Sequence, residues 1–182
     1  MAELTTKQET AYKNVIAAAT PSMMNDTLDE FSKLLPTPQN KRSEIADIFI
    51  EMLESSTDLP AKKQSRLVML LATIDTSNAA QVVAKYANAD SDHSNDRVRV
   101  WALLSLVKMS AHQDTYKLLK SISEQGSSNN RIHALILRLL VQCAGDDLEV
   151  SQQHIASLKA FYQEGDADHK WAVLRALRNN TN

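Results

Sequence analysis

Histidine and cysteine are the side chains of this sequence best suited to catalysis or to metal binding, and their spacing favours neither. The five histidines contain no His-x3-His or His-Glu pair and no Cys or Ser partner at a recognised motif spacing: they are His93, His112, His133, His154 and His169. Three glycines are too few for a phosphate-binding loop. We therefore expect no enzyme activity, metal or cofactor, although a triad assembled only in space stays open.

The single cysteine, Cys143, lies in an apolar run and excludes an intramolecular disulfide. A thiolate metal site needs more than one such ligand in its common forms. The sequence therefore predicts that Cys143 is a core residue.

The segment 90–96 spaces oxygen ligands at alternate positions, as a calcium-binding loop does. Asn95, however, stands where that loop needs its sharp-turn glycine, and Trp101 stands where it needs a bidentate glutamate. We expect a solvated loop instead, whose last Asn or Asp caps the following helix.

The composition indicates an almost entirely helical protein. The chain has 182 residues, enough for one domain or one short repeat array, and its formal net charge is −2. With only 3 glycines and 4 prolines there is little room for hairpins. The polar start lacks the apolar core of a signal peptide, and no apolar stretch approaches the ~20 residues that span a bilayer, so we expect a cytoplasmic protein.

Apolar residues at helical spacing predict about ten helices joined by short loops. The first starts at Thr6, with Glu9 completing a capping box, and Pro21 ends it. Gly126, Gly145 and Gly165 end three later helices. The other expected helices cover about 22–35, 43–55, 59–75, 77–88, 101–109, 114–124, 131–143, 148–162 and 171–177.

Three arginines mark an internal repeat. Arg66, Arg99 and Arg131 each lie three residues before a small or flexible apolar residue within a leucine-rich run, at offsets of 33 and 32 residues, and His169 follows 38 residues later. Such a period predicts stacked helix pairs. We expect one all-α solenoid domain over 1–182, with about five antiparallel pairs, an irregular repeat at 22–57 and clearer repeats at 60–178. The polar residues at 178–182 are typical of a terminal repeat.

The stretch from Asp96 to Leu106, with Val98-Arg99, Ala102 and a leucine run, resembles the second helix of a HEAT repeat. Arg66 and Arg131 match that pattern in part but lack the preceding Asp, which argues against an Asp–Arg ladder there. The resemblance implies a right-handed, HEAT-like or armadillo-like superhelix that binds proteins or, less often, nucleic acid. A weaker likeness is to the helical repeats of PCI-type complex subunits, but no winged helix follows here.

The same register supplies candidate binding residues. Trp101 and Trp171 each precede the register alanine, and they either pack in the core or anchor a partner at the surface. Arg66, Arg99 and Arg131 either line a concave groove or bond helix ends and carboxylates of an adjacent repeat.

We therefore expect a non-catalytic protein–protein interaction or scaffold module whose curved surface binds a protein and no membrane. The alternative is a nucleic-acid-associated repeat subunit of a translation or repair assembly. It requires the register arginines to converge with Lys108, Lys120 and Arg138 on one exposed stripe.

Overall fold

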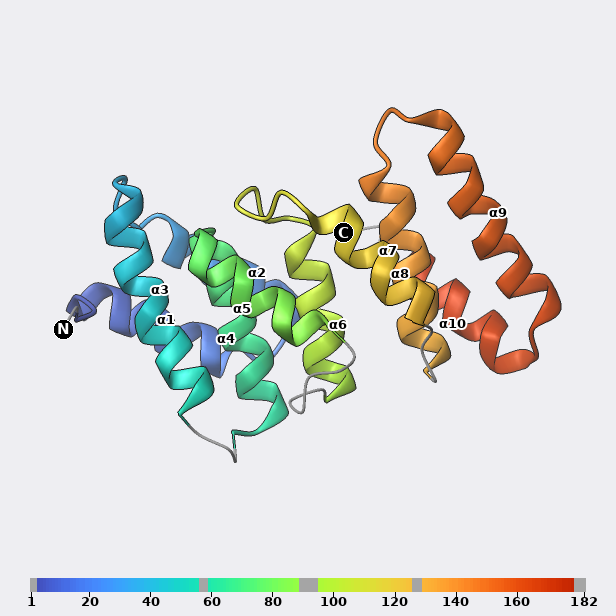
Figure 1. Cartoon of the computed structure of the whole chain (residues 1–182). Coiled ribbons are helices and arrows are strands. Elements are labelled where there is room, and N and C mark those ends of the chain that lie inside the picture. Colours follow the sequence, from blue (N-terminus) through green and yellow to red (C-terminus); the bar gives the residue numbers. More distant parts are fainter. Residues whose placement is uncertain (1–2, 56–58, 89–94, 126–128, 179–182) are drawn as a thin grey trace. The chain divides into compact units, whose positions relative to one another are not determined.

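All regular structure in the described part of the chain is helical. A computed structural model describes residues 3–55, 59–88, 95–125 and 129–178. Within these ranges it contains ten helices and no strand, which confirms the predicted all-α class (Figure 1). None of these helices combines the length and the hydropathy that a membrane crossing needs.

The helices gather into two compact units, Met1–Gln113 and Asp114–Asn182, here called the N-terminal and the C-terminal unit. The N-terminal unit contains α1 (Thr6–Ala17), α2 (Pro21–Ser32), α3 (Gln39–Glu54), α4 (Ala61–Ile74), α5 (Ser77–Ala87) and α6 (Asp96–Leu106). The C-terminal unit contains α7 (Thr115–Gln125), α8 (Asn130–Cys143), α9 (Leu148–Glu164) and α10 (Ala167–Arg178).

In the N-terminal unit, α4 is the central helix and contacts α1, α2, α3, α5 and α6. Its apolar residues from Leu67 to Leu71 are buried almost all round, as a helix covered by several neighbours requires. A second part of this core is aromatic. Phe49 is fully buried, with its ring centroid 5.3 Å from that of Tyr12 and 5.8 Å from that of Phe31.

The capping box of α1 lies one residue earlier than predicted. Thr5, rather than Thr6, is the N-cap, and Gln8 occupies the position expected for Glu9. The reason is a tertiary contact, because the buried Gln8 side chain also donates to the Leu34 carbonyl oxygen at 3.0 Å. Glu9 stays exposed and pairs with Lys13.

Several other helix ends differ from the prediction. Pro21 was expected to end the first helix, but α1 already ends at Ala17. Pro21 is instead the first residue of α2, where the missing N–H of a proline breaks no helical hydrogen bond. α10 begins four residues before Trp171, because Asp166 accepts the amide protons of Asp168 and His169. The expected cap on α6 is confirmed: the Asn95 side chain accepts from the Arg97 amide at 3.0 Å.

Asp75 joins the ends of two alternate helices in the N-terminal unit. It follows α4 in the left-handed conformation, with φ of 54°. Its carboxylate accepts from the Ser110 amide at 3.2 Å and from the Ala111 amide at 3.0 Å, just beyond the end of α6. These bonds tie the C-terminal ends of α4 and α6 together.

In the C-terminal unit, α8 is the central helix and contacts α7, α9 and α10. Small and branched side chains fill the space between α8, α9 and α10: they are Ala134, Leu137, Leu158, Ala172, Val173 and Ala176, with Phe161 packed against them.

Two of the three predicted helix-ending glycines lie in this unit's described part, and Gly126 lies outside the described residues. Gly145 follows the end of α8 with φ of +56°, a conformation that favours glycine. Gly165 follows the end of α9, and a glycine is needed there because neighbouring atoms approach closely. A Cβ added there would lie 2.2 Å from the His169 Cβ and 2.8 Å from the Phe161 carbonyl oxygen.

Candidate functional site

The exposed large hydrophobic side chains of the described residues are concentrated on two helices. Six of the seven lie on α9 and α10, and the seventh is Met23 on α2. The six are Leu148, Ile155, Tyr162, Trp171, Leu174 and Leu177. Apolar side chains gathered in this way mark an interaction site more often than scattered single ones do.

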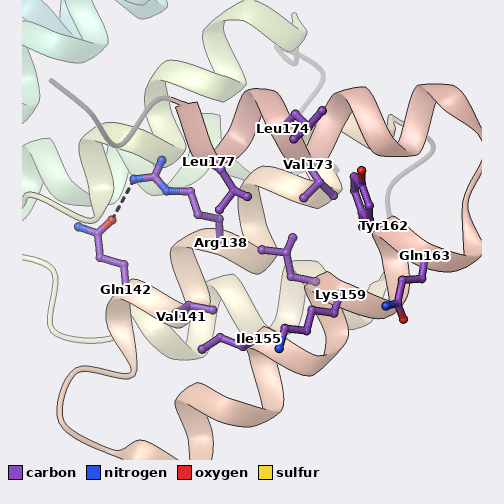
Figure 2. A pocket seen from close by; sticks show the side chains of 11 residues that line it. Arg138, Val141, Gln142, Ile155, Lys159, Tyr162, Gln163, Val173, Leu174 and Leu177 are labelled. Atoms are coloured by element: carbon purple, nitrogen blue, oxygen red, sulfur yellow. Dashed lines mark hydrogen bonds between the residues drawn. The ribbon is translucent and has the colours of Figure 1, made fainter.

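An apolar pocket of about 580 Å³ lies between α8, α9 and α10, and Ile155, Tyr162, Leu174 and Leu177 are among the residues that line it (Figure 2). Its volume falls in the range of sites that hold small molecules or partner side chains. The lining residues are Arg138, Val141, Gln142, Ile155, Leu158, Lys159, Tyr162, Gln163, Val173, Leu174 and Leu177.

Helical spacing explains how α9 forms one wall of the pocket. On α9, Ile155, Leu158, Lys159 and Tyr162 follow the i, i+3, i+4, i+7 pattern and therefore share one face. Leu158 reaches the core, whereas Ile155 and Tyr162 remain partly exposed at the pocket's edge.

The charged groups of this pocket are all basic. Arg138 is only 7% exposed, and its Nη2 donates to the Gln142 Oε1 at 3.5 Å. Burial lowers the pKa of the Arg138 guanidinium from its usual high value, and it stays a cation at neutral pH. Lys159 adds a second cation, and none of the eleven lining residues is acidic. Figure 2 shows Arg138 and Gln142 at one end of the pocket, with Tyr162 and Gln163 at the other.

From the sequence, Arg138 was expected only as part of a possible nucleic-acid-binding stripe, not as part of a pocket. Arg138 is a charged residue inside the otherwise apolar run from Leu135 to Val141, and it lies outside the repeat register. This charge within an apolar helical run was the feature of the sequence that could have indicated a site here.

Trp171 and Trp101 occupy the same register position but different surroundings. Trp171 on α10 is 72% exposed and lies one turn before Leu174, a residue of the pocket wall. Trp101 on α6 is partly buried and packs against a cluster that includes Met24 and Met69. Trp171 therefore leaves most of its side chain exposed to solvent, whereas Trp101 packs within the N-terminal unit.

The register arginines also separate. Arg66 and Arg99 are buried, and each bonds a carbonyl oxygen at the C-terminal end of another helix. Arg66 Nη2 donates to Ala18 at 3.0 Å, and Arg99 Nε donates to Ala87 at 3.2 Å. Both bonds match the interpretation that these side chains satisfy helix ends. Arg131 is exposed near the start of α8.

The alternative of a nucleic-acid-binding stripe required exposed arginines. Arg66, Arg99 and Arg138 are buried instead, so that expectation is wrong for these three residues. These three side chains are packed between helices, and Arg66 and Arg99 bond the ends of α1 and α5. They are therefore not on an exposed surface that could contact a phosphate backbone.

Cys143 and the calcium-like segment are the remaining candidates. Cys143 is half-buried rather than fully in the core, and burial raises the pKa of its thiol. Of the calcium-like segment, residues 90–94 lie outside the described residues. Within the described ranges, no three His, Cys, Asp or Glu side chains are grouped as metal ligands.

Two histidines of the C-terminal unit predict an acid-sensitive stability. Burial lowers the pKa of His133, with a further contribution from His169, and burial lowers that of His154, with a contribution from Lys120. Unfolded histidines titrate near 6.5, so the unfolded chain binds protons first as the pH falls. The free energy of unfolding of this unit therefore has its full value above about pH 6.5 and decreases as the pH falls below it.

We expect the urea midpoint of this unit to be lower at about pH 5.5 than at about pH 7.5. Hydrogen exchange of peptides from α8 and α9 measures this midpoint. The double substitution His133→Gln and His154→Gln should remove most of the difference. Asp166 does not contribute in this window, because its pKa is lowered from an already acidic value, mainly by its hydrogen bond with His169. Equal midpoints at both pH values would contradict the prediction.

Comparison with known proteins adds no relative to this picture: no family model, no curated protein and no solved structure matches the chain.

Proposed function

We propose that this protein is a non-catalytic interaction module, a short HEAT-like α-solenoid that binds a protein partner through the exposed apolar surface of α9 and α10. The observation that carries the proposal is the concentration of exposed apolar side chains on these two helices. A protein partner would remove that surface from water.

Contacts between alternate helices support the solenoid part of the proposal. Stacked helix pairs bring helix i against helix i+2. In the N-terminal unit α3 contacts α5 and α4 contacts α6, and the Asp75 carboxylate reinforces the second contact. In the C-terminal unit α8 contacts α10, and the Tyr116 hydroxyl on α7 lies 2.9 Å from His154 Nε2 on α9.

Trp171 supports the binding part. Tryptophan is enriched among the residues that dominate binding energy, because it buries a large rigid surface on association. At 72% exposure, Trp171 contributes little to folding and leaves most of its surface for a partner. The neighbouring Leu174 and Leu177, one and two turns further along α10, extend this apolar surface beside the pocket.

The test is a quantitative pull-down from cell lysate with the intact chain and with Trp171→Asp and Leu174→Lys. Loss of a central apolar anchor typically costs about 2 kcal/mol or more, so recovery of a specific partner should fall more than about tenfold. The control is Met23→Lys on α2, because Met23 is a comparably exposed apolar residue at 50%.

A partner retained by Met23→Lys and lost by both α10 variants supports the proposal. If both α10 variants recover the same proteins as the wild type, the apolar surface of α9 and α10 is not the binding surface. Far-UV circular dichroism should be unchanged in all three variants, since these side chains are exposed.

A further inference from the structure

The exposed cations around the apolar surface of α9 and α10 indicate which kind of partner that surface fits. Lys159 lines the pocket between α8, α9 and α10, and Lys170 and Arg175 are exposed residues of α10. We propose that the partner segment is an acidic amphipathic helix, whose apolar face covers this pocket and whose carboxylates pair with the three cations. This inference rests on the proposed function and specifies the chemistry of the partner.

Helical spacing places both α10 cations beside exposed apolar side chains. Lys170 lies four residues before Leu174, and Arg175 lies four residues after Trp171, so each pair shares one face of α10. Both apolar residues are more than half exposed. A partner that covers them therefore meets a positive charge at the edge of each contact.

The three cations are not already neutralised within the chain. Among the residues that the structure describes, their side chains make no ion pair or hydrogen bond. The acidic residues of the same two helices lie elsewhere. Asp168 accepts from the Asn130 side chain at 3.0 Å, Glu149 is more than a turn before Ile155, and Glu164 comes nine residues after Ile155, on the opposite side of α9. An approaching carboxylate therefore displaces no existing ion pair.

The apolar walls of the pocket favour a helical partner over an extended one. An extended segment would bury N–H and C=O groups against side chains that cannot bond them. An α-helix satisfies these groups internally and presents apolar side chains at i, i+3, i+4 and i+7, a repeat that covers about 10 Å. Six of the eleven lining residues are aliphatic: Val141, Ile155, Leu158, Val173, Leu174 and Leu177.

The hollow shape favours a protein segment over a lipid bilayer. Ile155 and Lys159 on α9 lie across the pocket from Leu174 and Leu177 on α10 (Figure 2). A volume of about 580 Å³ accepts large side chains that project from a partner helix. A bilayer is contacted by apolar side chains that project into it, so it would leave this hollow unfilled.

The experiment measures the affinity of the full chain for three designed peptides by fluorescence anisotropy. Each has about 15 residues on an alanine background, with leucines at i, i+3, i+4 and i+7 and with glutamates, glutamines or lysines beside them. The glutamate peptide should bind about tenfold more tightly than the lysine peptide, because several surface ion pairs replace several repulsions. The difference should shrink between about 50 and about 500 mM salt, since these charges are exposed.

Charge reversal connects this preference to the cations. Lys159→Glu combined with Lys170→Glu should invert the order, so that the lysine peptide binds more tightly than the glutamate peptide. Both side chains are exposed, so the helix content should not change. The matched control is Lys7→Glu combined with Lys33→Glu, which changes the net charge equally on exposed residues of the N-terminal unit and should keep the original order.

The outcomes separate this inference from the proposed function. Equal affinities for the three peptides, all lost in Trp171→Asp, would overturn the acidic partner and leave the apolar surface as a binding surface. An unchanged order in Lys159→Glu with Lys170→Glu would overturn it too, because the peptide would then lie elsewhere.

A membrane surface is the other outcome that would overturn the acidic helix. It would appear as binding to vesicles of equal parts phosphatidylcholine and phosphatidylserine without binding of the glutamate peptide. Absence of binding by all three peptides would also overturn the acidic helix, and the pull-down with Trp171→Asp then tests the proposed function by itself.

Discussion

Replacing Phe49 by alanine should remove about 3–5 kcal/mol from the free energy of unfolding of the N-terminal unit. The Phe49 side chain is fully buried, and its ring contacts Tyr12 from α1 and Phe31 from α2. Its loss therefore leaves a space that three helices line and that none of them can close without moving. A domain of this size has about 5–15 kcal/mol of stability in total, so the effect is large.

Each unit contains one tryptophan, which makes this measurement specific. In a Trp171→Phe background, fluorescence reports only on Trp101, which is partly buried in the N-terminal unit. The urea midpoint of that signal should fall steeply in Phe49→Ala. Tyr12→Phe is the control, because it keeps the ring contact and removes only a hydroxyl group. A Phe49→Ala midpoint equal to that of Tyr12→Phe would show that Phe49 does not hold these helices together.

Replacing Gly165 by alanine should cost the C-terminal unit about 3 kcal/mol, near the upper end of the usual range for adding atoms to a packed site. The new Cβ would lie 2.2 Å from the His169 Cβ and 2.8 Å from the Phe161 carbonyl oxygen. The first atom is attached directly to the α10 backbone and the second belongs to the α9 backbone. Neither can yield by a simple side-chain rotation, so the turn between the helices must open.

Opening that turn also disturbs the Asp166 cap on α10 and the ring contact between Phe161 and His169, whose centroids are 4.7 Å apart. Hydrogen exchange should therefore accelerate first in peptides of α10 and the end of α9. Gln153→Ala is the control, since Gln153 is exposed in the middle of α9 and its substitution should change stability by less than about 0.5 kcal/mol. Wild-type exchange rates in Gly165→Ala would contradict the steric argument.

The helical class and the number of helices were predictable because they depend on local signals. Few glycines and prolines, with apolar residues at helical spacing, leave no other regular structure available to most segments. Helix ends were less predictable, because distant groups decide them. The cap of α1 lies one residue earlier than predicted because Gln8 reaches Leu34, just beyond the end of α2, a contact that no local pattern contains.

The candidate site was predictable only in part, for the same reason. The register identified Trp171 as a possible anchor, because a tryptophan at a repeat position is visible in the sequence. It did not identify the pocket, since the pocket needs α8, α9 and α10 to pack before Arg138 and Leu174 share a wall. The register also could not distinguish Arg66 and Arg99, which are buried, from Arg131, which is exposed.

The bonds of Arg66 and Arg99 bear on how such a repeat can change during evolution. Both arginines donate to main-chain oxygens, of Ala18 and Ala87, and every amino acid supplies such an oxygen. The bond itself therefore makes no demand on the acceptor's side chain, and only packing restricts these two positions, because Ala18 and Ala87 are both buried. For these two bonds the arginine is the only side chain required, so an arginine can recur at the register position without a particular side chain recurring at the acceptor.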